Sequence, residues 1–191
     1  MQRIPYPDIT ELPEVMQKML AGTPLNIVKI GAHASQPLFE AQGQLGWAIA
    51  NPEVLEPKLR ETVILRVAHL SDSEYEIHQH KTLGRTAGLT EEEIGAIAGG
   101  DYARLPPLLA TAARFTDEVV LNLSPADDTL AQLRQLASDQ VVVNIVLTIG
   151  CYMSLARLIA VTGIPLDDNV LEQLPTGIDD KAEMLDKNSS G

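Results

Sequence analysis

The chain has 191 residues, a length that suits one domain and is small for two. Its 14 Lys and Arg residues against 26 Asp and Glu residues give a formal net charge of −12. This negative charge disfavours nucleic-acid binding, because phosphate groups need a basic protein face. It also disfavours docking on anionic membranes. Hydrophobic residues make up 45% of the chain, too large a share for a disordered protein, and a single cysteine excludes a disulfide framework and a four-cysteine zinc site. The first residues lack the apolar run of a signal peptide, so we expect a cytoplasmic protein.

Helical signals recur along the chain, whereas the alternation typical of strands is nearly absent. Pro57 stands where a first-turn proline belongs, Gly88 suits a helix stop, and Thr90 with Glu93 fits a capping box. We expect helices over residues 12–22, 24–34, 36–50, 57–70, 74–87, from 90 onward, 107–123, 127–137 and 139–162. These eight or nine helices predict an all-α domain over residues 1–175, followed by a poorly ordered tail over residues 176–191.

Residues 141–156 form the longest uncharged stretch of the chain. The stretch is shorter than the roughly 18 apolar residues that a membrane-spanning helix needs. A helix that is apolar on most faces is usually the buried centre of a domain or lies at a subunit interface. We therefore expect no membrane partner, and we expect this helix to be central or to contribute to a homo-oligomer.

The segment over residues 73–84 carries the candidate chemistry. On a helix, Glu76, His80, Leu83 and Ala87 lie on one stripe, and the first two have Cβ atoms roughly 5–6 Å apart. Burial would raise the pKa of Glu76 towards that of His80, so the two could exchange protons near neutral pH. We expect a hydrogen-bonded Glu76–His80 pair that faces a concave, mostly apolar pocket. The alternative is that Ser73 and Glu76 form a capping box, with His80 an ordinary buried histidine.

The preceding helix also carries a carboxylate on its apolar side. Glu61 shares a stripe with Ile64, Leu65 and Ala68. A charge on a core face is costly unless it is paired, so Glu61 is a third candidate. The alternative is a first-turn acid favoured by the helix dipole.

Three blocks of the chain resemble the carboxymuconolactone decarboxylase family, whose superfamily also contains the alkylhydroperoxidase D-like proteins. The blocks lie at residues 60–68, at 73–80 with the pattern Ser-x-Tyr-Glu-x-x-x-His, and at 87–94; a fourth match, at 149–157, includes Tyr152 and Arg157. The resemblance covers about residues 20–170. It implies a single all-helical domain that assembles as a dimer, trimer or hexamer.

The peroxidase branch of this superfamily has a Glu twelve residues before a Cys-x-x-Cys-x-x-x-His motif. On this chain the Glu and the His correspond to Glu61 and His80, whereas Ser73 and Glu76 stand at the two cysteine positions. Cys151 lies elsewhere, at a position that does not match the motif. Peroxide reduction by this route needs a reactive thiolate and a resolving cysteine. The resemblance therefore implies the decarboxylase branch rather than the peroxidase branch.

What the resemblance implies is a cofactor-free lyase or isomerase that acts by general acid/base catalysis on a small carboxylated or carbonyl compound. His80 would be the proton donor, Glu76 its orienting partner, and Glu61 a second acid/base or an anchor. The candidate substrate-binding residues are Arg66, Arg157, Tyr75 and His33, of which the arginines would bind an anionic group. His33 has packing as its alternative. No metal is implied, although Glu61, Glu76 and His80 would be a chemically possible ligand set.

Two alternatives from other functional classes stay open. One is a peroxidase-type antioxidant protein whose redox cysteines are absent or supplied otherwise. The other is a non-catalytic helical assembly. Of the remaining histidines, we expect His78 to be solvated or at a subunit interface and His69 to be a cation at the end of its helix. The substrate and the pathway are not specified by the sequence.

We predict that the protein lacks thiol peroxidase activity, because a serine cannot be oxidised to a sulfenic acid. Hydroperoxide consumption with a dithiol reductant checks this, with Cys151→Ser and metal removal as controls. Turnover that survives both controls would contradict the prediction and the assignment to the decarboxylase branch.

Overall fold

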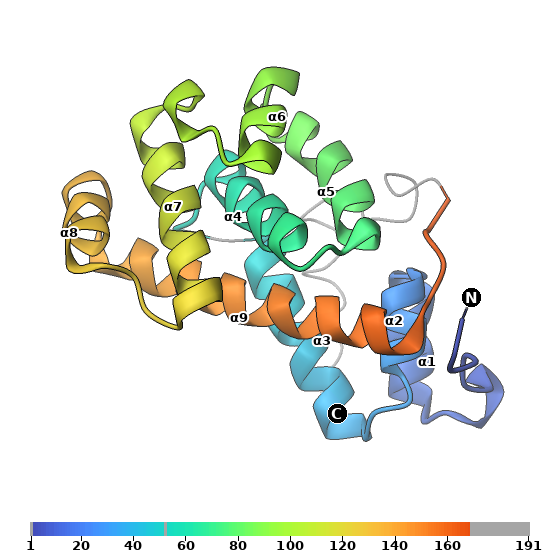
Figure 1. Ribbon diagram of the computed structural model, residues 1–191. Coiled ribbons are helices and arrows are strands. Elements are labelled where there is room, and N and C mark those ends of the chain that lie inside the picture. Colours follow the sequence, from blue (N-terminus) through green and yellow to red (C-terminus); the bar gives the residue numbers. More distant parts are fainter. Residues whose placement is uncertain (1, 52, 169–191) are drawn as a thin grey trace.

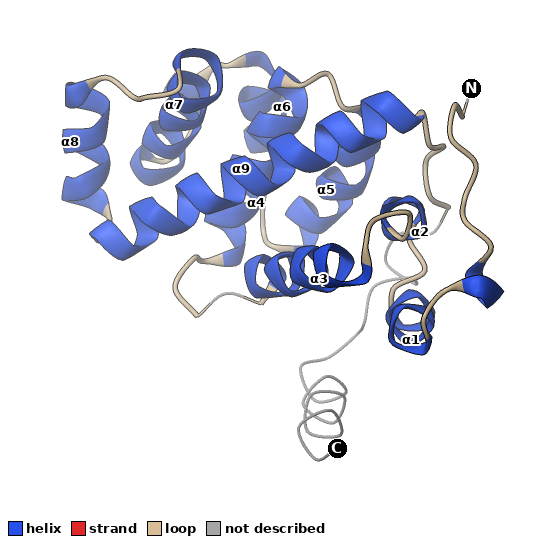
Figure 2. Ribbon diagram, turned by 90° about the horizontal axis from the view of Figure 1, so that it is seen from below, coloured by secondary structure: helices blue, strands red, loops and turns tan. Residues whose placement is uncertain are grey.

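The computed structural model describes residues 2–51 and 53–168 (Figure 1). Within these ranges helices and the loops between them make up the chain, and it has no strand, which confirms the all-α prediction (Figure 2). The predicted tail over residues 176–191 lies outside the described residues. The helices are α1 (Glu14–Gly22), α2 (Asn26–Gly31), α3 (Gln36–Ala50), α4 (Pro57–Leu70), α5 (Glu74–Thr86), α6 (Glu91–Gly99), α7 (Pro107–Asn122), α8 (Asp127–Leu136) and α9 (Asp139–Thr162), with 3-10 turns η1 (Ile9–Glu11) and η2 (Tyr102–Arg104).

Local sequence signals set several of these boundaries. The capping box of α6 is confirmed: the Glu93 N–H donates to Thr90 Oγ1 at 3.1 Å, and the Thr90 N–H donates to Glu93 Oε2 at 2.9 Å. Gly88, just past α5, has a φ of +93°, which favours glycine and stops the helix. The expected helix over residues 24–34 is shorter than predicted, because α2 ends at Gly31 and a turn follows.

Helix α4 is the centre of the fold. It contacts α5, α6, α7 and α9, and its residues Val63, Ile64, Leu65 and Val67 are fully buried. We expected the helix at residues 139–162, with its uncharged stretch 141–156, to be central or to lie at a subunit interface. In the structure α4 takes the central place, and the interface stays a prediction. α9 runs along one side of the bundle, from α8 at one end to α2 at the other, and α4 fills the interior (Figure 2).

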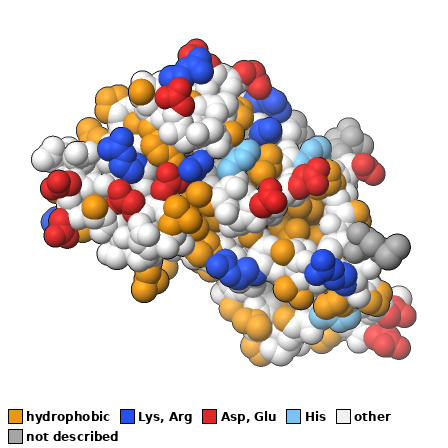
Figure 3. Space-filling view, viewed as in Figure 1, with side chains coloured by type: hydrophobic (Ala, Val, Ile, Leu, Met, Phe, Trp, Pro, Cys, Tyr) orange, Lys and Arg blue, Asp and Glu red, His pale blue; other side chains and the backbone are white. Residues whose placement is uncertain are grey.

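One face of α9 is apolar and uncovered. Its large exposed side chains include Val143, Val146 and Leu147, and Leu147 is 56% exposed. By length and composition alone α9 could cross a membrane, since an 18-residue window within it has a mean hydropathy of 1.8. In the structure, 39% of that window is buried. A single helix of this kind is weak support for a membrane span, because core helices share the same composition. On the face shown in Figure 3, basic and acidic side chains are interspersed and do not form a basic patch.

The uncovered face of α9 supports the proposal that the protein is a homo-oligomer, because burial of apolar surface is the main driving force of association. We expect light scattering at micromolar concentration to give a multiple of 20.7 kDa. Leu147→Asp should shift the mass towards the monomer, whereas Leu121→Asp, at an exposed position of α7, should not. A wild-type mass of a single chain would contradict the proposal.

Candidate functional site

The site begins at the tight connection between α4 and α5. Asp72 has a left-handed φ of 50°, and the Ser73 N–H donates to Ala68 O at 2.9 Å, so the chain reverses within three residues. Further along α5, a Cβ at Gly84 would lie 3.0 Å from Leu89 Cδ1 and 3.4 Å from Leu65 Cδ1. Glycine at this position therefore lets α5 pack closely on α4. The two helices bring their inward polar side chains together.

Glu61 of α4 and His80 of α5 form a buried hydrogen-bonded pair. His80 Nδ1 lies 2.7 Å from Glu61 Oε2, and the two residues are 6% and 1% exposed. Burial alone would raise the pKa of Glu61, but the charges and hydrogen bonds of His80 and Arg60 outweigh it and lower the pKa. Arg60 contributes through its Nε, which donates to Glu61 Oε1 at 2.9 Å. Glu61 is therefore an ionised carboxylate that orients the imidazole.

Glu76 lies one turn before His80 and has a different environment. It is 2% exposed, and its Oε2 has no hydrogen-bond partner within the described part of the chain. Burial raises its pKa to about 8, so at neutral pH it is mainly the uncharged acid. The expected elevation of this pKa is therefore supported by the structure.

Two of our expectations for Glu76 were wrong. Its carboxyl is not hydrogen-bonded to His80, because His80 Nδ1 is bonded to the ionised Glu61, a stronger acceptor than a neutral acid. The capping-box alternative also fails. Ser73 is the N-cap residue of α5 but its side chain makes no capping bond, and Ser73 Oγ is itself buried without a partner.

Helix α9 contributes two residues that we did not predict as site residues. The Tyr152 ring packs edge-on against the His80 ring, with centroids 5.0 Å apart and planes at 85°. Burial raises the pKa of Tyr152 well above its usual value, and the charge of Glu61, together with that of Glu76 once it has ionised, adds to the effect. Cys151 is buried, and Gln42 of α3 donates to its Sγ at 3.4 Å. The match at residues 149–157 was the signal that could have identified Tyr152.

The Cys151 thiol is not activated. Burial raises its pKa, the hydrogen bond from Gln42 opposes this without reversing it, and the charge that Glu76 carries once it has ionised raises the pKa further. At neutral pH Cys151 is therefore a protonated thiol, which is a poor nucleophile.

Arg66 does not take the substrate-binding role that we expected. Its Nε donates to Asp117, and its NH1 donates to the carbonyl oxygens of Ile97 and Ala98 at 3.0 and 3.2 Å. The guanidinium also stacks over Tyr102, 5.5 Å from the ring centroid. Arg66 thus joins α4 to α6 and α7, because a partly buried cation must be paired.

The Tyr75 hydroxyl also has a structural role in place of the expected substrate contact. It donates to Asp167 and accepts from the Ile27 N–H at 3.1 Å. Asp167 also accepts from Gln79 Nε2 at 2.7 Å and from the Asn26 N–H at 2.9 Å. These four contacts, which we call the Asp167 clasp, hold the segment after α9 against α2 and α5. Tyr75 is buried within the clasp.

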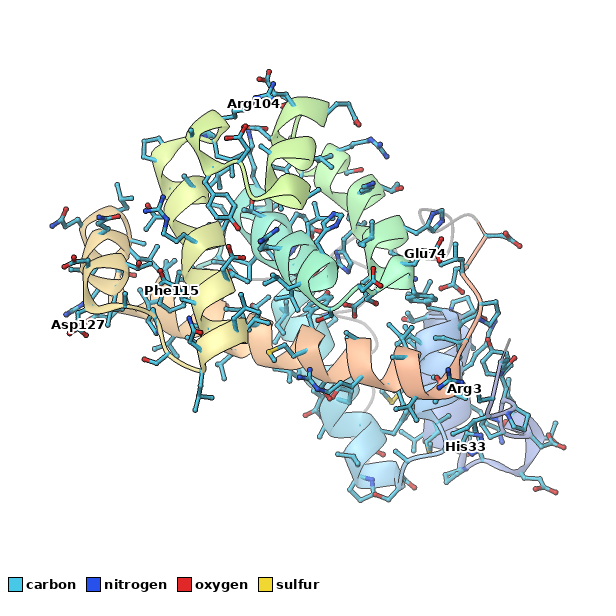
Figure 4. All side chains as sticks on the ribbon, in the orientation of Figure 1. Arg3, His33, Glu74, Arg104, Phe115 and Asp127 are labelled. Carbon is cyan, nitrogen blue, oxygen red and sulfur yellow. The ribbon has the colours of Figure 1, made fainter. Side chains whose placement is uncertain are left out.

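The remaining substrate-binding candidates lie outside the site. His33 is exposed, and its Nε2 contacts Pro5 O at 2.8 Å, so it neither packs in the core nor lies at the site; Figure 4 shows it well away from Glu74 at the start of α5. Arg157 is exposed and donates to Met153 O of its own helix at 2.7 Å. Both side chains hold local backbone groups and are not directed at Glu76.

The other histidines differ from each other. His78 is exposed, as expected. His69 was expected to be a helix-end cation, but burial, with the charges of Lys81 and Arg66, lowers its pKa and favours the neutral ring. In the part of the chain that the structure describes, no three His, Cys, Asp or Glu side chains are placed to hold a metal ion. Glu61, Glu76 and His80 are therefore not arranged as a ligand set.

Comparison with protein families gives one match. Residues 36–118 match the carboxymuconolactone decarboxylase family. This range contains Glu61, Glu76 and His80 but not Cys151 or Tyr152. No curated protein sequence matches the chain at a significant level.

Solved structures with this fold include several alkylhydroperoxidase-like proteins. An uncharacterised peroxidase-related protein from Ralstonia eutropha with an AhpD core has a TM-score of 0.76 at 18% identity, covering 92% of this chain and 98% of its own. A protein of unknown function from Agrobacterium tumefaciens, with a suggested AhpD role in antioxidant defence, has a TM-score of 0.64 at 19% identity, covering 77% and 99%. The debrominase Bmp8 has a TM-score of 0.69 at 12% identity, covering 84% and 90%. At these identities the likeness concerns the fold.

The burial of Glu76 predicts a specific dependence of stability on pH. The unfolded chain releases this proton near pH 4.5 and the folded chain near pH 8, so the folded state binds more protons between these values. The free energy of unfolding should therefore fall as pH rises through this window, by up to about 5 kcal/mol. Glu76→Gln should remove this contribution, whereas Glu74→Gln, at an exposed position of the same turn, should keep it.

Urea denaturation of both variants and the wild type at pH 5 and pH 8 measures this difference. Equal losses of stability in the wild type and in Glu76→Gln would contradict the raised pKa of Glu76.

Proposed function

Because residues 36–118 match the carboxymuconolactone decarboxylase family and the fold resembles that of AhpD-like proteins, we propose that this chain is a member of that family and a general acid/base enzyme. The proposed reaction is that of a lyase or isomerase on a small carboxylated or carbonyl compound. The observation that supports this is the contrast between two buried carboxyls on adjoining helices, Glu61 ionised and Glu76 uncharged. Carboxyls driven to opposite protonation states are typical of acid/base sites.

The proposed roles differ from those inferred from the sequence alone. Glu61 accepts from His80 Nδ1–H, so Nε2 is the ring nitrogen left for proton transfer with a substrate. His80 would take a proton from the carbon next to a carbonyl group, while the uncharged Glu76 donates a hydrogen bond to the carbonyl oxygen. The electron pair of the broken C–H bond moves onto that oxygen as an enolate, which Glu76 stabilises. Return of the proton to another carbon completes an isomerisation.

The same groups suit loss of carbon dioxide from a carbonyl compound. The bond between the carboxylate and the carbon next to the carbonyl group breaks, carbon dioxide leaves, and the electron pair forms the enolate beside Glu76. His80, protonated from solvent, then delivers that proton to the same carbon. In both reactions Tyr152 would keep the His80 ring in position through the contact between the two rings. The residues of this chain supply both the acid and the base.

The peroxidase alternative has less support. Its structural basis is the shared fold with AhpD-like proteins. Ser73 and Glu76 stand at the positions of the redox cysteines, and the remaining thiol, Cys151, is buried with a raised pKa. A thiolate attack on peroxide is disfavoured by these features. The proposed function therefore remains acid/base chemistry.

Exchange of carbon-bound hydrogen with solvent tests the proposal without knowledge of the natural substrate. We expect the protein in D2O to catalyse deuterium incorporation next to the carbonyl of at least one compound in a panel of small ketones, lactones and keto acids, followed by NMR. His80→Ala and Glu76→Leu should reduce the rate by about 10²–10⁴-fold, the usual contribution of an acid or base. His78→Ala is the matched control, because His78 is exposed on the same helix.

The expected outcome is exchange that depends on His80 and Glu76 but not on His78. Exchange that is absent across the panel, or that persists unchanged in His80→Ala, would overturn the proposed function.

A further inference from the structure

Arg60 and Glu61 are neighbours in the chain, and their side chains are bonded to each other. Adjacent residues of an α-helix point about 100° apart, so their side chains do not normally meet. In α4, however, Arg60 Nε donates to Glu61 Oε1 at 2.9 Å, and the Arg60 side chain is only 14% exposed. The arginine side chain therefore turns towards its neighbour, and a further contact is needed to offset the entropy lost by fixing it there.

The end of α3 supplies that contact. Arg60 Nη1 donates to Ala50 O at 2.6 Å, and Ala50 is the last residue of α3. Carbonyl groups in the last turn of a helix have no partner within the helix and carry partial negative charge. The guanidinium thus lies between two negative groups, the end of α3 and the carboxylate of Glu61, and it is bonded to both.

The same carboxylate continues the chain of bonds to the imidazole. Each oxygen of Glu61 has its own partner, Oε1 the Nε of Arg60 and Oε2 the Nδ1 of His80 at 2.7 Å. With both oxygens engaged the carboxylate is held in one orientation, whereas with Arg60 removed one oxygen would be free and the group could turn. Three successive bonds therefore connect Ala50 O at the end of α3 with the imidazole on α5.

The charges around Glu61 show what else Arg60 contributes. The cationic groups that lower the pKa of Glu61 are the imidazole of His80 and the guanidinium of Arg60. The other titratable groups around the pair, Glu76 of α5 with Tyr152 and Cys151 of α9, are acids and supply no positive charge. Once the imidazole is neutral, Arg60 is thus the cation that compensates the buried carboxylate.

We propose that Arg60 is a positioning residue of the site, which joins the end of α3 to Glu61 and holds that carboxylate, charged and in one orientation, against His80 Nδ1. Its part in catalysis rests on the proposed function, in which Nε2 of His80 takes and returns the proton of the substrate. Arg60 acts on this nitrogen only through Glu61.

Removal of Arg60 has a defined effect on the pair. Glu61 and His80 should then keep a shared proton to higher pH, because its loss would leave a buried negative charge without compensation. If that proton is on the imidazole, both ring nitrogens carry hydrogen. If it is on Glu61 and is donated to Nδ1, the neutral ring carries its hydrogen on Nε2. In either case Nε2 is blocked as a base.

A titration of the full chain tests this without a substrate. The imidazole C–H NMR signals of His80, assigned by their loss in His80→Ala, are followed against pH, and their midpoint belongs to the pair. Arg60→Met should raise this midpoint by about one pH unit, the effect of a lost neighbouring charge, and Arg60→Lys should restore at least half of the shift. Arg104→Met is the matched control, because it changes the net charge equally in an exposed pair with Glu92.

Catalysis should follow the titration. Below the midpoint, carbon–hydrogen exchange in Arg60→Met should be slower than in the wild type by about tenfold for each pH unit of the shift, because less of the base is available. Should Arg60→Met fail to fold, Arg60→Gln, which lacks the charge but keeps an amide donor, is titrated in its place with the same expected direction.

The inference is overturned if the midpoint is unchanged without Arg60, if Arg60→Lys shifts it as far as the uncharged variant does, or if Arg104→Met shifts it equally. Its failure is distinguishable from that of the proposed function. A raised midpoint in a protein that exchanges no carbon-bound hydrogen would refute catalysis alone. Exchange that depends on His80, with a midpoint that ignores Arg60, would refute the positioning role alone.

Discussion

The hydrogen bond between Glu61 and His80 is the interaction on which the arrangement of the site depends. A carboxylate as deeply buried as Glu61 must be compensated, and its partners are the adjacent Arg60 and an imidazole from another helix. The bond therefore helps fix the position of α5 along α4. Glu76 is carried into the core by the same helix, but it has no cation of its own. One pairing thus leaves the neighbouring carboxyls in opposite states of charge.

The fold could be predicted because its signals are local. The capping box at Thr90, the left-handed Gly88 and the proline at the start of α4 each act within a few residues, and each ends or begins a helix where the sequence indicates. Which helix is the most deeply buried was harder to predict. The uncharged stretch 141–156 of α9 favoured a central position or an interface for that helix, yet α4 is the more deeply buried helix although it carries several charged residues, because Glu61 and Arg66 have partners inside the protein.

The sequence predicted which residues belong to the site but not which of them are hydrogen-bonded to each other. Inward stripes identified Glu61, Glu76 and His80, since helical spacing decides which face a residue occupies. Spacing along one helix says nothing about hydrogen-bond acceptors on another helix. The sequence therefore did not show that His80 would bond to Glu61 of α4 and not to Glu76 of its own helix. Long side chains were the least predictable: Arg66 and Tyr75 reach partners distant in sequence, Asp117 and Asp167. Tyr152 and Cys151 enter the site only through the crossing of α9.

The Asp167 clasp gives α5 two neighbouring faces with separate tasks. Tyr75 and Gln79 hold the segment after α9, while Glu76 and His80, each one position further along the helix, face the acid/base groups. Opening of the clasp and movement of the site are thereby coupled through one rigid helix. Local unfolding of the segment after α9 would disturb the proton-transfer groups before the α4 core opens, so amide hydrogen exchange in α5 should report the attachment of that segment. The stability of the short segment after α9 thus becomes a determinant of the geometry around His80.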